Sequence, residues 1–278
     1  MANLAYIQVT RKCNQTCRFC SNPPTSKHQS VSFFKQLMDY YKQKKYVGVI
    51  LTGGEPTLYP YLHELIEYAN KKKLQLRVMT NGQIISDLNY LKSLHAAGLR
   101  HVGLSLYSNN SKIQAFLTKN PTSLYHIKKA LGNLEKCNIK TDIITVINKY
   151  NADHLSGIVQ WIVSNYPFVR HFVWNNLDPL MNRASRHKDT IPKLRDIELE
   201  LFKAMSYLTD QQRTFRVERL PLCYMADFAF CSTETRKIIK GEERTVYFLD
   251  HKKLVRQNKW SYGKTRSEEH TSELQSPY

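Results

Sequence analysis

The chain has 278 residues, 42% of them hydrophobic, which is enough to bury the core of one large domain or of one domain with an appendage. No apolar run reaches the 18 or more residues of a membrane span, and the N-terminal residues lack the basic and then apolar layout of a secretory signal, so we expect a cytoplasmic protein that does not bind membranes. The net charge of +18 raises nucleic-acid binding as a hypothesis, but the lysines are spread along the chain, which favours solvated helix faces.

Segments typical of strands and segments typical of helices alternate from residue 5 to about residue 180. Apolar runs such as Val49-Ile50-Leu51 are typical of parallel strands that are buried on both faces. The expected strands are 5–10, 47–52, 74–80, 101–107, 140–147 and 169–175. The expected helices are 32–45, 61–73, 86–97, 122–137 and 153–165, with Gly98 closing the third and Asp153 opening the fifth.

Six such units predict an α/β fold with parallel strands and right-handed crossovers. They are fewer than the eight units of a closed barrel, so we expect a partial (β/α)6 TIM-like barrel over residues 1–185. Functional residues of such a fold lie at the carboxyl ends of the strands. The conspicuous motifs of this chain all follow expected strands, which agrees with that placement.

The remainder of the chain is expected to form a connector and a small second unit. Residues 186–215 are polar, with one helix at 193–208, and are interpreted as the connector. Residues 216–265 are expected to be a truncated α+β extension, with a charged helix at 233–240 and a hairpin that joins 246–250 to 253–257.

The last thirteen residues, 266–278, resemble the in-frame translation of a sequencing adapter. We therefore expect a non-native tail, with the native frame interrupted near Thr265, and exclude this stretch from fold reasoning.

Three cysteines, Cys13, Cys17 and Cys20, share one short loop after the first expected strand. In a reducing compartment such cysteines favour metal ligation over disulfides. An iron–sulfur cube is normally held by four thiolates, so three thiolates leave one iron open for chemistry. Taken alone, the loop could also be a zinc site that lacks one ligand.

A second motif, Gly53-Gly54-Glu55-Pro56, follows the second expected strand. The glycines remove side chains, so that a ligand can approach the backbone. Backbone carbonyls and Glu55 can accept hydrogen bonds from a ligand ammonium group, and Pro56 stiffens the turn. Taken alone, the motif could be an ordinary turn.

Together the two motifs resemble the signatures of the radical S-adenosylmethionine (SAM) superfamily, including the aromatic Phe19 before the last cysteine, over residues 5 to about 180. The resemblance implies a [4Fe–4S] cluster on the three cysteines, with the SAM amine and carboxylate on the open iron. It also implies reductive cleavage of SAM to a 5′-deoxyadenosyl radical, which abstracts a substrate hydrogen, and an electron donor such as flavodoxin or ferredoxin.

Four further residues are candidate SAM contacts by the same resemblance. Thr80 and Asn81, in the polar turn after the third strand, would lie near the ribose or carboxylate, or simply cap the strand. Ser105, between apolar neighbours, can point into the barrel toward the SAM carboxylate, or be satisfied by backbone. Asn175, at the end of the sixth strand, is a weaker candidate of the same kind.

Cys223 and Cys231 lie beyond the barrel, where SPASM/twitch-type radical SAM proteins carry an auxiliary-cluster domain. Residues 220–224 and 260–264 resemble the start of such a domain, with Cys223 as an auxiliary-cluster ligand. Cys231 is as readily a buried thiol, and Cys137 is interpreted as a structural thiol. The sequence as written cannot complete an auxiliary iron–sulfur cluster.

The resemblance thus implies a radical SAM enzyme of unknown substrate, with a peptide or protein as the typical target of that architecture. A molybdenum-cofactor-biosynthesis-like radical SAM cyclase is an alternative within the superfamily. A basic zinc protein that binds nucleic acid is the alternative from another class, because +18 can hold phosphates. That alternative leaves the Gly-Gly motif and the strand–helix alternation unexplained.

Overall fold

The computed structural model describes residues 3–22, 25, 28–179, 182–233, 235, 244–249 and 253–257. Nine strands form one sheet in the order β7-β6-β5-β4-β3-β2-β1-β8-β9, in which only the β8–β9 pair is antiparallel. The strands are β1 Leu4–Thr10, β2 Gly48–Gly53, β3 Gln75–Thr80, β4 His101–Ser105, β5 Lys140–Ile147, β6 His171–Asn176, β7 Thr214–Glu218, β8 Arg244–Phe248 and β9 Lys253–Gln257.

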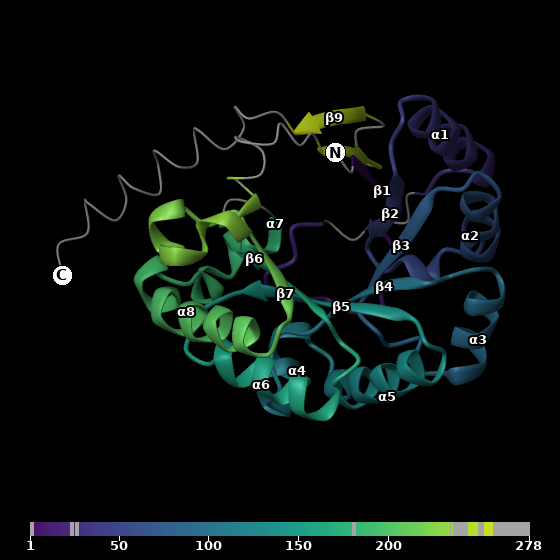
Figure 1. Cartoon of the computed structure of the whole chain (residues 1–278). Helices are drawn as coiled ribbons and strands as arrows, with labels where there is room; N and C mark the ends of the chain where they lie inside the picture. Colours follow the sequence, from purple (N-terminus) through teal and green to yellow (C-terminus); the bar gives the residue numbers. More distant parts are fainter. Residues whose placement is uncertain are drawn as a thin grey trace.

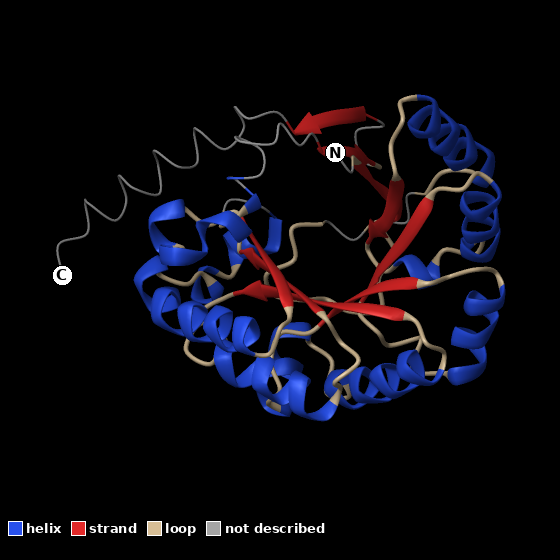
Figure 2. Cartoon of the chain, viewed as in Figure 1, coloured by secondary structure: helices blue, strands red, loops and turns tan. Residues whose placement is uncertain are grey.

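The sheet curls into a partial barrel whose helices cover its outer side (Figures 1 and 2). The α-helices are α1 Val31–Gln43, α2 Leu62–Lys71, α3 Leu88–Ala96, α4 Ser111–Thr118, α5 Ser123–Lys136, α6 Leu155–Asn165, α7 Asn182–Arg186 and α8 Leu194–Asp210. Four 3₁₀ turns are η1 Pro56–Leu58, η2 Lys188–Thr190, η3 Leu222–Tyr224 and η4 Ala226–Cys231. The expected α/β partial barrel is therefore confirmed.

The helices bury one apolar stripe each against the sheet. In α2 the buried residues Leu62, Leu65, Ile66 and Ala69 recur at helical spacing, so one face of the helix joins the core while the other faces water. Cys137 belongs to the same core, as expected of a structural thiol. No helix among the described residues combines the length and the apolarity needed to cross a bilayer.

Two elements inside the barrel were not expected from the sequence. Helix α4 follows β4, and β7 pairs in parallel with β6. Helix α8, within the expected connector, buries an apolar face in the core and leads into β7. Residues 194–218 therefore continue the strand–helix repeat, and the sheet has more units than six.

The expected hairpin is present, but its first strand does not belong to a separate sheet. Strand β8 pairs in parallel with β1, so the hairpin extends the barrel sheet at the edge opposite β7. Asp153 does not cap α6, because the helix begins after His154 and the Asp153 carboxylate instead accepts from the His154 ring at 2.7 Å. Most of the helix expected at 233–240, residues 260–264 and the tail 266–278 lie outside the described residues.

Candidate active site

The cysteine loop and the Gly-Gly turn touch through backbone at the carboxyl ends of β1 and β2. The Gly54 N–H donates to the Thr10 carbonyl at 2.7 Å, and the Glu55 N–H donates to the Lys12 carbonyl at 2.9 Å. A Cβ placed on Gly54 would lie 2.3 Å from the Lys12 oxygen, and Gly53 has a φ of +136°. Both positions therefore require glycine, and the turn packs directly against the chain that enters the cysteine loop.

The three thiols of the loop are partly buried and take part in local hydrogen bonds. The Gln15 N–H donates to the Cys13 sulfur at 3.4 Å, the Cys17 thiol donates to Gln15 Oε1 at 3.7 Å, and the Cys20 thiol donates to the Asn22 carbonyl at 3.3 Å. All three cysteines are free and only partly exposed. The loop thus presents three soft sulfur donors from one short segment.

The electrostatics of the loop favour the binding of a cation. Burial raises the pKa of the Cys13 thiol to about 11 and raises that of Cys17 further, and negative charge on the neighbouring cysteines adds to both shifts. Thiolates at Cys13 and Cys17 are therefore unfavourable here unless positive charge compensates them, as bound iron would.

The donor set fits an iron–sulfur cluster. Thiolates are the ligands that iron–sulfur clusters take, one for each iron, so the ligands of a cube are spread around it. Among the described residues, no three His, Cys, Asp or Glu side chains converge as the ligands of a single ion would.

A chain of buried amides and a hydroxyl connects the loop to the outer helices. Gln15 Nε2 and Gln114 Nε2 both donate to Ser123 Oγ, at 3.2 and 3.1 Å, and Gln114 Oε1 accepts from the N–H groups of Tyr107 and Ser108, both at 3.0 Å. Gln15, Gln114 and Ser123 are each at most 5% exposed. This chain fixes the loop between Cys13 and Cys17 against α4, α5 and the end of β4.

The Glu55 side chain, a candidate acceptor for a ligand ammonium, is fully engaged inside the protein. One oxygen accepts from the Thr57 N–H at 3.1 Å, from the Thr57 hydroxyl at 2.7 Å and from the Thr80 hydroxyl at 2.7 Å, while the other accepts from the Asn81 N–H at 2.7 Å. The residue is 1% exposed, and burial raises its carboxyl pKa although these donors oppose that shift. The carboxylate and Thr80 thus hold the two turns together.

The other expected SAM contacts differ in how they are connected to the cysteine loop. Asn81 reaches the cysteine loop, where its Nδ2 donates to Asn14 Oδ1 at 2.7 Å and lies 3.9 Å from the Cys13 sulfur. Ser105, half-buried at the end of β4, shares a hydrogen bond with the Tyr107 hydroxyl. Asn175, on β6 opposite Val146 and Glu218, is half-buried.

Two residues next to the loop were missed in the sequence. The Tyr107 ring meets Phe19 edge-on at 4.7 Å; burial raises its hydroxyl pKa well above the usual range, and charge on the three cysteines adds to the shift. Arg183 donates through Nη1 to the Cys17 carbonyl at 3.3 Å and through its backbone N–H to the Cys20 carbonyl at 3.2 Å. Tyr107 could have been predicted from the sequence, because it lies two residues after the candidate Ser105. No local sequence pattern identifies Arg183.

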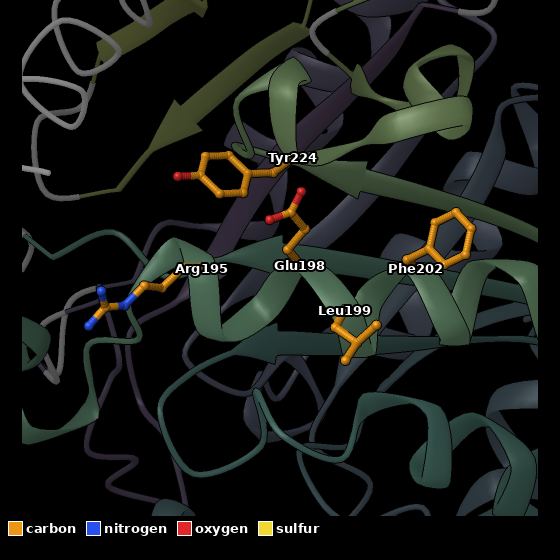
Figure 3. A pocket seen from close by; sticks show the side chains of 5 residues that line it. All are labelled: Arg195, Glu198, Leu199, Phe202 and Tyr224. Atoms are coloured by element: carbon orange, nitrogen blue, oxygen red, sulfur yellow. The ribbon is translucent and has the colours of Figure 1, made fainter. Parts of the chain in front are cut away.

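Cys223 is exposed in η3, on elements different from those that form the cysteine loop. The next residue, Tyr224, lines an open pocket, and Figure 3 shows the Glu198 carboxylate of α8 directed toward the Tyr224 ring of η3. The pocket is lined by Arg195, Glu198, Leu199, Phe202 and Tyr224.

Comparisons with known proteins agree with this geometry. The model of the Radical SAM superfamily matches residues 7–162. The 7,8-dihydro-6-hydroxymethylpterin dimethyltransferase of Methanocaldococcus jannaschii is 29% identical over 221 residues, 76% of this chain and 43% of the relative. The GTP 3′,8-cyclase of Aquifex aeolicus is 26% identical over 167 residues, 56% of this chain and 51% of the relative. The chain spans about half the length of these two relatives.

Solved structures share the fold at low sequence identity. Streptococcus suis SuiB, bound to its precursor peptide SuiA, matches with a TM-score of 0.69 and 17% identity over 88% of this chain and 58% of that chain. A native anSMEcpe with bound AdoMet and a peptide matches with a TM-score of 0.66 and 19% identity over 89% of this chain and 72% of that chain. Since the family model spans more than half of the chain and includes both the cysteine loop and the Gly-Gly turn, the chain belongs to the radical SAM superfamily and is an enzyme of that superfamily.

Proposed function

We propose that this enzyme reductively cleaves SAM at a [4Fe–4S] cluster held by Cys13, Cys17 and Cys20, and that the resulting 5′-deoxyadenosyl radical abstracts a hydrogen atom from a peptide or protein. Membership of the superfamily implies the cluster and SAM. The observation that carries the proposal is the backbone contact between the three-thiol loop and the Gly-Gly turn, which brings a metal site and a bare-backbone ligand site together. When bound, the cluster supplies the electron that cleaves the carbon–sulfur bond.

Within the described part of the chain, the Gly54 carbonyl is the one in this turn that accepts no hydrogen bond, so it suits the SAM ammonium group. The Gly53 carbonyl accepts from Asn22 Nδ2 at 3.1 Å, and the Glu55 carbonyl accepts from the Leu58 N–H at 3.0 Å. We therefore assign the ammonium group to the carbonyl of Gly54, with Gly53 permitting its approach. In this assignment Glu55 is a positioning residue that holds the turn rather than a direct contact.

We assign the remaining polar candidates to SAM binding according to their contacts with the cysteine loop. Asn81 touches both Asn14 and the Cys13 sulfur, so we propose that it contacts SAM beside the cluster. Thr80 supports it through Glu55, and Ser105 faces the same region through Tyr107. Asn175 remains a proposal supported by its place at the end of β6.

We further propose an auxiliary iron–sulfur cluster with Cys223 as one ligand, as in SPASM-type enzymes. The exposed thiol of Cys223 and the hairpin that follows it in the chain support this proposal. The peptide class of substrate is supported by two neighbours of the same fold that hold peptides, SuiB and anSMEcpe. The expectation of a cytoplasmic protein stays a prediction.

A cyclase acting on a nucleotide is the second candidate. It is supported by the GTP 3′,8-cyclase of Aquifex aeolicus, whose identity of 26% extends over 56% of this chain. Incubation of the reconstituted enzyme with SAM and GTP distinguishes the candidates, because only a cyclase would consume GTP in step with 5′-deoxyadenosine formation.

The proposal is tested by anaerobic reconstitution with iron and sulfide, followed by assay of bound iron and of 5′-deoxyadenosine. We expect the wild-type protein to be brown and to cleave SAM, and Cys17→Ala to do neither. Cys137→Ala is the matched control, because that thiol lies in the core away from the loop, and it should retain both properties. Zinc near one equivalent without iron, or SAM cleavage that persists in Cys17→Ala, would contradict the proposal.

A further inference from the structure

A set of cations adjoins the cysteine loop without being used by the proposed chemistry. They come from the loop itself, from the end of α4, from the turn after β5 and from the α7–η2 segment. We call this surface the basic face, and its members are Arg18, Lys119, Lys149, Arg186 and Lys188. Arg18 is half-exposed and the other four are exposed.

Hydrogen bonds and one ring contact join these segments into one surface around the loop. Arg18 donates its backbone N–H to the Leu117 carbonyl at 2.9 Å and its Nε to the Phe116 carbonyl at 3.2 Å. The Phe116 ring packs on Tyr150 at 4.7 Å, and the N–H of Lys149 donates to the Thr190 carbonyl at 2.9 Å. The α7–η2 segment is tied back to the loop by the two hydrogen bonds of Arg183 to cysteine carbonyls, described above.

The charge on the basic face is not neutralised locally. None of its five cations has an ion-pair partner within the part of the chain that the structure describes. In the described segments 116–119, 149–150 and 183–190 the only carboxylate is Asp189, which accepts from the Tyr150 hydroxyl at 2.9 Å. By contrast, the half-exposed Lys72 pairs with Asp39 at 2.7 Å. The basic face is therefore an unbalanced positive surface beside the loop.

We propose that the basic face docks an acidic, low-potential electron-carrier protein that reduces the cluster. The inference rests on the proposed function, because reductive cleavage of SAM needs one electron from outside. The donor, a reduced flavin or iron–sulfur protein, loses one electron and the cluster gains it, and no bond between heavy atoms forms or breaks in this step. Docking here brings the donor against the Cys17–Cys20 segment, which Arg18 and Arg183 tie to the same surface.

Charge complementarity argues for this partner rather than for nucleic acid. Electron-transfer encounters use small interfaces steered by opposite charge, and five unpaired cations provide such steering. Single-stranded nucleic acid needs aromatic faces on which bases stack. On this surface the Arg18 guanidinium lies 4.0 Å from the centre of the Phe116 ring, and the Tyr150 ring packs on Phe116, so those faces are engaged.

The test compares two ways of reducing the reconstituted enzyme. Stopped-flow absorbance follows cluster reduction by a reduced flavodoxin of acidic surface and, separately, by dithionite. The double variant Lys119→Glu/Lys149→Glu reverses two charges of the basic face. The matched control, Lys71→Glu/Lys92→Glu, reverses two exposed lysines on α2 and α3.

We expect the flavodoxin rate constant at low salt to fall about tenfold or more in the basic-face variant, with weaker salt dependence, because steering typically changes association rates by 10- to 1,000-fold. The dithionite rate and the control variant should match the wild type. Equal flavodoxin rates in both variants would overturn the proposal, as would loss of RNA binding in the basic-face variant with its flavodoxin rate unchanged. Failure of the proposed function is distinguishable, since it appears as absent SAM cleavage even in the dithionite-reduced wild type.

Discussion

Gly54 is the point at which the Gly-Gly turn meets the chain that leads into the cysteine loop. Its missing side chain lets the turn donate to the Thr10 carbonyl at 2.7 Å while lying against the Lys12 and Arg11 carbonyls. In the sequence the same glycine could be explained by ligand approach alone. The structure shows that packing of the protein itself already requires it.

We therefore expect Gly54→Ala to distort the site by steric clash. The new Cβ would lie 2.3 Å from the Lys12 oxygen and 2.6 Å from the Arg11 oxygen, so the loop must move. We expect a loss of about 1–3 kcal/mol in the free energy of unfolding and reduced iron binding after reconstitution. Gly132→Ala in α5, where nothing lies within 4 Å of the added carbon, should instead gain about 0.5–1 kcal/mol. Denaturant unfolding with iron analysis checks both, and equal effects would refute the argument.

Ser123 illustrates a contribution that the sequence does not reveal. Its hydroxyl receives hydrogen bonds from Gln15 and Gln114, and the first of these spans 108 positions of the chain. The cysteines and the Gly-Gly turn were identifiable because their spacing is local and specific. A buried bridge between distant segments has no local signature, so only the fold discloses it.

Ser123→Ala should leave two buried amide donors, those of Gln15 and Gln114, without their acceptor. Each unsatisfied group typically costs about 1–3 kcal/mol, and the loop between Cys13 and Cys17 loses its anchor. We expect a lower melting temperature and less iron per chain, with the iron loss exceeding that of a variant of equal stability elsewhere in the barrel. Ser164→Ala, on the exposed face of α6, should match the wild type. An unchanged iron content in Ser123→Ala would show that the bridge does not support the loop.

At the scale of elements, β1–β6 followed from the sequence because buried parallel strands are apolar and end in recognisable turns. Strand β7 did not, because Arg216 and Glu218 make it look polar; they pair with each other at 2.7 Å, so the charged strand is stabilised locally. Helix α4 has only eight residues and buries the polar Gln114 and Thr118, which weakens its amphipathic pattern. The parallel pairing of β8 with β1 joins residues that are far apart in the sequence, so no local sequence pattern predicts it.

The β8–β9 hairpin should stabilise the barrel by covering the β1 edge. The Tyr46 hydroxyl hydrogen-bonds with Thr245 Oγ1 at 2.6 Å, the Leu249 N–H donates to Gln8 Oε1 at 3.1 Å, and the Tyr247 ring packs on Phe33 at 5.2 Å. A chain ending at residue 235 loses these contacts and exposes an unpaired edge. We expect it to lose about 3 kcal/mol or more and to self-associate, whereas a chain ending at residue 257 should not. Size-exclusion chromatography and thermal unfolding measure both, and identical behaviour would refute the role of the hairpin.

At the scale of the whole molecule, the amino-end halves of β3–β7 hold a group of charges far from the cysteine loop in the strand register. The His101 ring donates through Nε2 to Asp142 Oδ2 at 2.8 Å, and Arg77 lies 3.6 Å from the same carboxylate. His171 pairs with the Thr214 hydroxyl at 2.8 Å. Burial lowers the His171 pKa to about 4, and the positive charges of Arg216, Arg77 and Lys140 add to that effect while Asp142 opposes it.

This shift predicts a loss of stability on mild acidification. Between pH 6.5 and about 4 the unfolded chain protonates this histidine while the folded chain does not, so stability falls as the pH drops through that window. With a discount for partial exposure of the ring, we expect about 2 kcal/mol from this group. Denaturant unfolding at pH 7 and pH 4.5 should show a smaller loss in His171→Gln than in the wild type. The pKa of the Asp142 carboxyl is lowered, so protonation of this group reduces stability only below this pH window. An equal loss in both proteins would exclude His171 as the cause.

The central claim is that three thiolates of one loop hold a cube with an open iron beside the Gly-Gly turn. Electron paramagnetic resonance of the anaerobically reconstituted and reduced enzyme tests it most directly, recorded before and after addition of SAM. We expect the signal of a reduced [4Fe–4S] cluster whose g-values shift when SAM binds, and no such signal in Cys17→Ala. A reduced-cluster signal that SAM leaves unchanged, or the absence of any cluster signal in the wild type, would contradict it.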